Sequence, residues 1–392
     1  MQYLSLLLKL TWMLAVSALL SVAHAAPIVV QAGPTTLSLG DQLHFFEDAD
    51  NRLSISDIQL EGNARQFTPS RQNYLRFGYT RSTFWLRFDL RNASDQNLPL
   101  ILELERASLG TAQLYVPTEN SYQMQEAGVQ TAHPSGALQH RTPVFTLNLP
   151  AHSSQRFFVR LDSSQRMDLS VNLYDPASFA VDQNNRQLLH GLAGGLLIGI
   201  CLYSMLVSLF TKERGFLHYS VYLLAVTAWI ASNMGYLGVR WLAYPGLQNI
   251  IEQEMGLITL AANTLFARHF LNIQNISTKL DKVMMGTVIM LMAALLFIFI
   301  PHSAQIHLWM FICSSVVLIF TALRVWVAGY TPTLFYLLAR IPLTIATVIN
   351  GLGIFADAIR PVSLDAVILI ALVFDAVVIS LGLGDRFRNW QL

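Results

Sequence analysis

The chain has 392 residues, of which 53% are apolar and 12% charged, and its mean hydropathy of +0.44 lies well above that of a soluble globular protein. This composition indicates a membrane protein, and a formal net charge of +1 argues against a nucleic-acid binder, which would need a basic patch or stripe. Residues 27–185 hold 28 charged side chains in 159 positions, whereas residues 186–392 hold 20 in 207. We therefore expect a soluble half followed by a membrane half.

Residues 1–25 have the pattern of a secretory signal peptide. Lys9 supplies the positive charge of the n-region, Leu10 to Leu20 form an apolar stretch, and Ala23-His24-Ala25 is a small-x-small cleavage site. We expect the mature chain to begin near Ala26, outside the cytoplasm.

The segment 26–185 is predicted to form an all-β domain, a jelly roll or sandwich. In the stretch from Phe84 to Arg91, apolar side chains alternate with Trp85, Arg87, Asp89 and Arg91, as in a half-buried strand. Residues 98–104 and 156–162 alternate in the same way, and clusters of turn-forming residues separate the runs. Several short strands without a long helical pattern favour two packed sheets.

One face of these strands is a candidate ligand site. Trp85 and Phe158 are predicted to point outward beside Arg87, Arg156 and Arg160, and an exposed aromatic ring with planar donors suits a sugar. Alternatively, a loop covers the aromatic rings and the arginines only face solvent. Because no carboxylate pair, nucleophile elbow or His cluster is present in this half, we expect no catalytic residues and no enzyme activity.

Cys201 and Cys313 both lie inside apolar runs of the membrane half. The soluble half therefore cannot contain a disulfide framework or a cysteine-based metal site. We expect no metal and no cofactor.

Seven apolar segments follow, each close to the roughly 20 residues that a spanning helix needs. They cover Leu188–Phe210, Phe216–Tyr236, Asn249–Phe270, Val283–Ile300, Ile306–Val327, Thr333–Phe355 and Val362–Gly384. With the first segment starting outside, eight lysines and arginines flank the inner ends and three flank the outer ends, as the positive-inside rule requires. This topology predicts a multi-pass protein with a cytoplasmic C-terminus.

Two ionisable residues inside the spans are candidates for signalling. Arg340 lies about seven residues into the sixth segment and Asp375 about ten from the end of the seventh, so their depths differ by about 4 Å. We expect them to pair, with the adjacent Pro342 as a hinge. The pair is either a conformational latch or an attachment that only holds the helices together. Weaker candidates are His190, Glu252, Glu254, Asn263 and Asn350.

Two other classes of membrane protein fit the spans less well. A retinal protein is excluded because residues 362–384 contain no lysine for a Schiff base. A secondary transporter would show paired, Gly- or Pro-broken segments in corresponding halves; Pro342 is the only proline within the spans, and no repeat is found.

The residues themselves suggest a family. The segments Leu75–Thr80, Phe84–Asn92 and Val171–Phe179 resemble the second type of extracellular domain of the bacterial seven-transmembrane receptors with diverse intracellular signalling modules, the 7TMR-DISM group. In the membrane half, Gly215–Tyr222, Ala267–Leu271 and Ser380–Arg386 carry the resemblance by their order and spacing. The resemblance implies a periplasmic jelly roll similar to carbohydrate-binding modules, and an acidic residue at the position of Asp375; Arg340 departs from the family pattern.

The resemblance also implies the function. We expect a receptor of the bacterial inner membrane with a signal peptide (1–25), a periplasmic sensor domain (26–185), a seven-helix domain (186–385) and a short cytoplasmic tail (386–392). Expected partners are the lipid bilayer, a carbohydrate or protein ligand, a kinase or cyclase supplied in trans, and a second copy of the chain. Because family members usually continue into a histidine kinase or diguanylate cyclase, one alternative is a truncated sensor of such an enzyme. Another alternative is an envelope interaction or assembly protein that senses no ligand.

Overall fold

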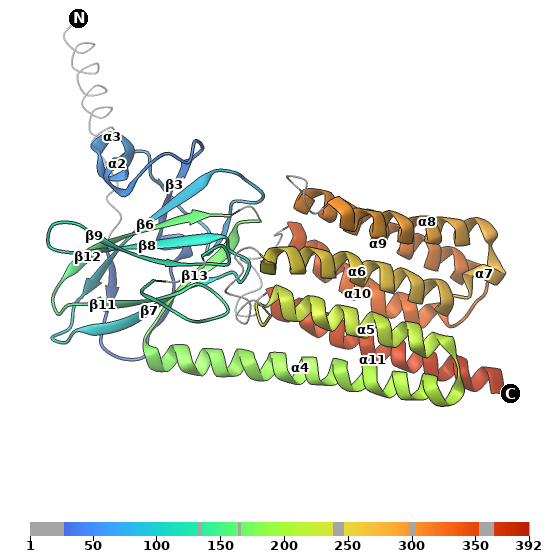
Figure 1. The fold of residues 1–392 in the computed structure, drawn as a ribbon. Coiled ribbons are helices and arrows are strands. Elements are labelled where there is room, and N and C mark those ends of the chain that lie inside the picture. The colour runs from blue at the N-terminus through green and yellow to red at the C-terminus, as the bar shows by residue number, and fades with distance from the viewer. Residues whose placement is uncertain are drawn as a thin grey trace, which may run out of the picture.

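The computed structural model describes residues 27–131, 135–163, 166–237, 247–297, 303–352 and 364–391. A β domain comes first and a bundle of long helices follows it (Figure 1). The predicted signal peptide lies outside the described residues.

The β domain consists of two sheets. The first contains β4 (Thr68–Pro69), β3 (His44–Asp48), β6 (Thr83–Asn92), β12 (Ser154–Asp162), β8 (Thr111–Pro117) and β9 (Tyr122–Ala127), with β1 (Ile28–Val30) parallel to β6. The second contains β10 (Ala137–Leu138), β11 (Val144–Leu149), β7 (Leu98–Glu105), β13 (Asp168–Tyr174) and β2 (Thr36–Ser38), with β5 (Tyr74–Arg76) on β13. The three strands expected from alternation are β6, β7 and β12.

The alternating apolar residues of these strands form the core between the sheets. Phe84, Leu86, Phe88 and Leu90 of β6 are buried and share one cluster with apolar residues of β7, β11 and β13 in the other sheet. Burial of a Leu or Phe side chain stabilises by about 1.5–3 kcal/mol, so these side chains account for the pairing of the two sheets. The prediction of an all-β first domain is therefore confirmed at the level of two packed sheets.

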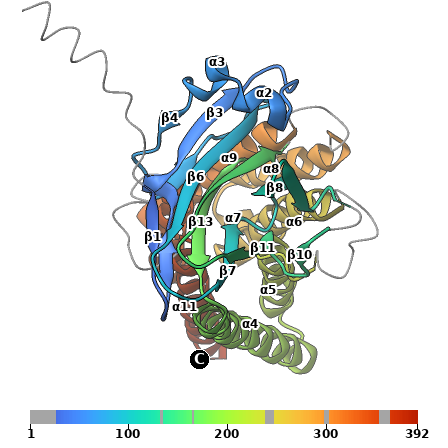
Figure 2. The ribbon, with the colours of Figure 1, turned by 90° about the vertical axis from the view of Figure 1, so that its left-hand side faces the viewer.

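The other face of β6 is covered as well. Two short helices, α2 (Ile55–Gln59) and α3 (Glu61–Ala64), lie near β3 at the end of the domain away from the bundle (Figures 1 and 2). Ile58 and Phe67 from this segment pack in a cluster with Trp85 and Phe158. Of the two alternatives for this face, the exposed platform is wrong and the covered arrangement is the one observed, since Trp85 is 0% exposed and Phe158 3%.

The helical part begins directly after β13. Its helices are α4 (Pro176–Thr211), α5 (Arg214–Asn233), α6 (Leu247–Phe270), the short α7 (Ile273–Ile276), α8 (Thr278–Ala294), α9 (Ser303–Val327), α10 (Thr333–Leu352) and α11 (Leu364–Gln391). Neighbours in the chain pack against each other, and α11 also packs against α4. The C-terminal end of α11 lies at the end of the bundle farthest from the β domain (Figure 1).

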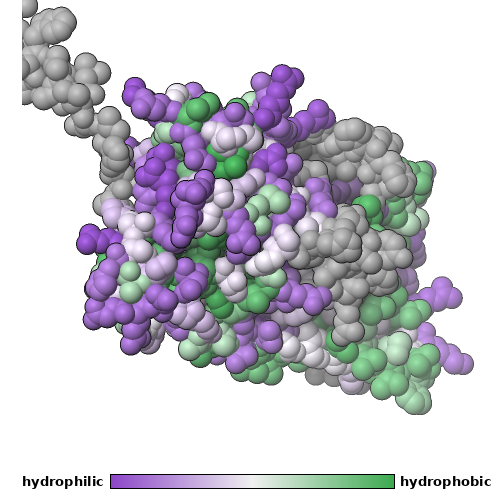
Figure 3. Space-filling model, turned by 60° about the vertical axis from the view of Figure 1, so that its left-hand side comes forward, coloured by the Kyte–Doolittle hydropathy of each residue, from purple (hydrophilic) through white to green (hydrophobic). Residues whose placement is uncertain are grey.

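Each of the seven predicted segments overlaps one long helix among the described residues. Four of these helices, α4, α5, α9 and α11, are long and apolar enough to cross a membrane. Large exposed apolar residues cover the helices, whereas the surface of the β domain is mainly hydrophilic (Figure 3). The protein is therefore a membrane protein, and seven crossings remain a prediction.

Helix α4 joins the two parts without a break. It runs for 36 residues, about 54 Å, so the predicted boundary at residue 186 falls within it. Asp175 caps its first turn by accepting hydrogen bonds from the backbone N–H groups of Ala177 at 2.9 Å and Ser178 at 3.1 Å. The other carboxylate oxygen accepts from the Thr35 backbone N–H at 2.7 Å, so this cap also attaches the helix to the β domain.

Replacing Asp175 by Ala should reduce the stability of the protein by about 0.5–2 kcal/mol, the usual effect of losing an N-cap. Burial raises the pKa of Asp175, but hydrogen bonds from Ser178, Thr35 and Ala177 outweigh it and bring the pKa to about 2. Since the folded pKa lies below the ordinary value of 3.8, this stabilisation is complete above pH 3.8 and is lost as the pH falls through 2. Thermal unfolding in lipid nanodiscs measures the effect, and Asp175→Asn, which keeps a capping oxygen, should lose less.

Candidate functional site

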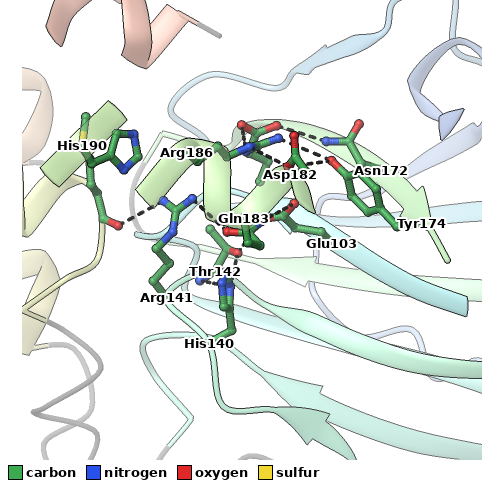
Figure 4. Close-up of polar contacts among 12 residues, drawn as sticks. Glu103, His140, Arg141, Thr142, Asn172, Tyr174, Asp182, Gln183, Arg186 and His190 are labelled. Carbon is green, nitrogen blue, oxygen red and sulfur yellow. Dashed lines mark hydrogen bonds and ion pairs between the residues drawn. The ribbon is translucent and has the colours of Figure 1, made fainter. Parts of the chain in front are cut away.

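The junction between the β domain and the bundle is rich in polar contacts. Figure 4 shows Asp182, Gln183 and Arg186 of α4 pointing toward strands β7 and β13. Arg186 forms ion pairs with Glu105 at the end of β7 and, at 2.8 Å, with Asp182 one turn earlier in α4. It also donates to the Tyr174 hydroxyl at 3.4 Å. A single guanidinium thus holds the first turns of α4 against both strands.

Glu103 is the buried centre of this junction. Its side chain is 0% exposed and accepts hydrogen bonds from the Thr142 hydroxyl at 2.9 Å and from Nε2 of Gln183 at 3.3 Å. Arg141 donates to Oε1 of Gln183 at 3.4 Å, which links the loop before β11 to the same helix. Because an unpaired buried carboxylate is costly, Glu103 requires α4 to be docked with Gln183 in place.

The connection between α5 and α6 meets the β domain at a second place. Arg141 donates to the Met234 carbonyl at 3.4 Å, and Gln248 at the start of α6 donates to the Ala107 carbonyl at 3.4 Å. Gly235 has a φ of +80°, and a Cβ atom there would lie 2.7 Å from the Arg141 carbonyl oxygen. This close approach requires glycine. Among the described residues, α4, the start of α6 and the residues just after α5 therefore contact the β domain at one end of the bundle.

The bundle interior brings the predicted pair together. Nε of Arg340 on α10 lies 3.4 Å from Oδ1 of Asp375 on α11, and the two residues are 6% and 0% exposed. Tyr222 of α5 completes the group, since its hydroxyl accepts from Nη1 of Arg340 at 2.9 Å and donates to Oδ2 of Asp375 at 3.3 Å. The Arg340 guanidinium also lies over the rings of Tyr222 and Tyr336. Sequence reasoning missed Tyr222, although a tyrosine near the middle of an apolar span was the available signal.

The other residues of the bundle that the sequence marks as candidates do not join the Arg340–Asp375 pair in one group. Pro342 lies within α10, which the structure describes as one helix. His190 Nδ1 lies 2.7 Å from the Tyr236 hydroxyl, and Glu252 accepts from Asn233 at 2.8 Å. Asn263 faces a cavity beside Arg340. The side chain of Asn350 lies outside the described residues.

The far end of the bundle carries a second polar group. Nη1 of Arg386 near the end of α11 donates to the carbonyls of His269 at 3.0 Å and Phe270 at 3.1 Å, the last residues of α6. Glu213, just before α5, lies 3.5 Å from His269. These contacts, together with the pairing of Arg386 and Glu213, attach α11 to the end of α6 and to the start of α5, at the end of the bundle opposite the β domain.

The predicted ligand-binding arginines are engaged within the protein. Arg87 donates to the Ala64 carbonyl at 3.1 Å and lies over the Phe67 ring, so it holds α3 in place. Arg156 makes a two-point ion pair with Asp89, at 2.7 and 2.9 Å, and Arg160 donates to Gln113 at 3.4 Å. With Trp85 and Phe158 buried beneath α2, this face does not form an exposed aromatic platform.

A cleft of about 520 Å³ opens elsewhere in the β domain, between β3 and β6 of one sheet and β5 of the other. Phe45, Phe77 and Phe84 form its aromatic wall, and the Phe77 and Phe84 rings stack at 3.9 Å. Its polar lining includes Glu47, Ser70, Arg71, Gln72, Arg76 and Thr80. Sequence reasoning missed this cleft because it forms only where β5 of one sheet comes beside β3 and β6 of the other, a packing that alternation within single strands does not predict.

His140, before β11, is a titratable group of the junction whose protonation depends on burial. Burial, followed by the charge of Arg141, lowers the pKa of His140 to about 4, although hydrogen bonding with Thr142 and Gln183 opposes the shift by favouring the protonated ring. Its ring lies against Phe179 of α4, with centroids 5.6 Å apart. The junction therefore holds His140 in its neutral form at neutral pH.

Lowering the pH from 7.5 to 5 should weaken the junction. The folded pKa of His140 lies below its ordinary value of 6.5, so the unfolded chain binds more protons between those values and stability falls as the pH drops through this window. Thermal unfolding of the full chain in nanodiscs measures the effect. Carboxylates begin to titrate in the same range, so His140→Asn is the control, and an unchanged pH dependence in that variant would contradict the assignment.

Among the residues that the structure describes, no group of three His, Cys, Asp or Glu side chains could hold a metal ion. No curated protein matches the chain. Residues 40–175 match the family model described as 7TMR-DISM extracellular 2, and residues 186–386 match the model described as 7TM diverse intracellular signalling. The second match alone covers more than half of the chain, and residues 176–185, the first turns of α4, separate the two matches. The chain belongs to the 7TMR-DISM family, whose two domains follow each other here in the order sensor and membrane bundle.

Proposed function

We propose that this protein is a receptor of the bacterial inner membrane that binds a ligand on the periplasmic side and transmits a conformational signal through its helices to the cytoplasmic side. The observation that carries this proposal is the junction, where the β domain contacts α4 directly through Glu103, Glu105 and Arg186. Ligand binding can influence the cytoplasmic side only if it favours one arrangement of the helices. A domain attached by a flexible linker would lack this coupling.

The cleft beside β5 is the proposed ligand site, in place of the face around Trp85. Aromatic rings next to guanidinium and amide groups suit a carbohydrate, which stacks its C–H face on a ring and hydrogen-bonds its hydroxyls to the rim. Phe77 supplies the ring, and Arg71 and Gln72 supply donors. The volume of about 520 Å³ lies within the range of small-molecule sites.

The proposed route runs from the junction along α4 and through the interior group to the far end of the bundle. Helix α4 packs against α5 and α11, and Tyr222 of α5 bonds to both Arg340 and Asp375. A shift of α4 would therefore change the contacts by which Tyr222 joins α5 to α10 and α11. Arg386 and Glu213 lie where this change would reach the cytoplasm, and a kinase or cyclase is the proposed recipient there.

Two measurements on the full chain in nanodiscs test the proposal. Sugars and short glycans are titrated while thermal stability is followed, and Phe77→Ala should abolish the ligand-induced shift that Arg65→Ala, outside the cleft, retains. Hydrogen exchange of residues 212–218 and 264–270 should change with ligand in the wild type. If a ligand binds but this exchange does not change, the protein is an envelope binding or assembly protein and the receptor proposal is wrong.

A further inference from the structure

We infer that a cavity inside the bundle binds ordered water that solvates the Arg340–Asp375 pair. This inference does not depend on the proposed function. The cavity has a volume of about 70 Å³ and is bounded by α5, α6, α9, α10 and α11. Since one water needs roughly 10–15 Å³ measured in this way, the space is sufficient for several waters and too small for a drug-sized ligand.

The position of the cavity follows from its lining. Tyr336 and Thr347 mark its extent along α10, eleven residues or about 16 Å apart, and Arg340 lies one turn from its Tyr336 end. Trp229 of α5, which also lines it, is closer than Tyr222 to the junction with the β domain, because α5 ends at Asn233 beside Met234. The cavity therefore extends from the ion pair toward the β-domain end of the bundle.

Four buried polar atoms at this cavity make no hydrogen bond of ordinary length with the described residues. They are Nε and Nη2 of Arg340, the Tyr336 hydroxyl and Oδ1 of Asn263, on side chains that are 6%, 0% and 6% exposed. The Tyr336 hydroxyl lies near both Arg340 and Asn263, so the unsatisfied groups face one another. Buried polar groups in folded proteins are almost always hydrogen-bonded to protein or to ordered water. Their chemistry is complementary, since a guanidinium donates, a carbonyl oxygen accepts and a hydroxyl does both.

Water fits this set better than an ion. Asp375 already neutralises Arg340, so an added anion or cation would leave a net charge inside the bundle. A water can accept from Nη2 of Arg340 and donate to Asn263, and a second can serve Tyr336. The pair at 3.4 Å is then part of a hydrated group rather than a dry one, which lets its members change partners without leaving a charge unsolvated.

Radiolytic hydroxyl-radical labelling in nanodiscs tests the inference, because it oxidises buried side chains that lie next to bound water. Tyr336 should be labelled faster than Tyr219, which is equally buried at 0% exposure but does not line the cavity and donates to the Ala376 carbonyl. Equal labelling of the two tyrosines would overturn the inference.

Filling the cavity gives a second, independent readout. Ser315→Leu should lower the melting temperature, because it displaces water from Arg340 and Asn263, whereas Val316→Leu, on the exposed side of the same helix, should leave it unchanged. A dry cavity would respond in the opposite way, since filling an apolar void stabilises. A higher melting temperature for Ser315→Leu would therefore overturn the inference. If that variant does not fold, the labelling comparison in the wild type still decides.

Discussion

Replacing Arg340 by Leu should destabilise the bundle by about 3–5 kcal/mol, because Asp375 would remain inside as a charge without its partner. Both side chains are almost completely buried, and the few ordered waters of the cavity carry no charge that could replace the missing guanidinium. Tyr222 would lose one of its two interactions as well. Unfolding in mixed micelles, followed by circular dichroism, measures the loss, and Asp375→Leu should produce one of similar size.

The double variant Arg340→Leu with Asp375→Leu should recover most of this stability, because an apolar pair of similar volume often replaces a buried ion pair without loss. Arg324→Leu, an exposed arginine of α9, is the control and should change stability by less than about 1 kcal/mol. The wild type, Arg340→Leu, Asp375→Leu and the double variant form a double-mutant cycle. Additive losses in that cycle would show that the two residues do not interact.

The same double variant decides between the two roles of the pair. If the pair only holds helices together, the variant should still pass a ligand response to the far end of the bundle. If it is a latch, the variant should fold and bind ligand, but hydrogen exchange near Glu213 and Arg386 should no longer respond. Folding and signalling are thereby separated, which neither single variant allows.

Much of the β domain follows from period-2 alternation. The pattern from Phe84 to Leu90 predicts both the strand and the face that meets the core, because one strand face must be buried in any two-sheet arrangement. The covering of Trp85 was not predictable in the same way. It depends on Ile58 and Phe67, which lie in a short helical segment with little periodicity, and alternation does not show that both faces of a strand are buried.

In the membrane half too, some features follow from the sequence and others do not. Apolar length and charge position predict the helices, and depth along the helices places Arg340 near Asp375. The junction was missed because its residues look ordinary in sequence. Glu103 occupies a polar position in an alternating strand, which usually means exposure, but contacts with α4 and with Thr142 bury it. The spacing of Asp182 and Arg186, four residues apart, was the one available sign of a polar helix face.

Replacing Arg186 by Met should reduce the stability of the full chain by about 2–3 kcal/mol, because a partly buried cation with several partners is removed. Glu105, Asp182 and the nearby Glu103 would then face one another without this guanidinium. Since like charges repel, α4 should move away from β7 and β13. Thermal unfolding in nanodiscs measures the stability, and hydrogen exchange of residues 101–105 and 140–144 should increase.

The matched control is Arg65→Met, which removes an ion pair of the same spacing, Glu61 with Arg65, at the surface of α3. Those side chains are 89% and 76% exposed, so the loss should stay below about 1 kcal/mol. Arg186→Lys keeps the charge but cannot reach Glu105, Asp182 and Tyr174 together with a planar group, and it should fall between the wild type and Arg186→Met. If Arg186→Met reduces stability as little as the control does, Glu103 and Gln183 hold the junction without Arg186. The signal must then pass through Glu103 and Gln183.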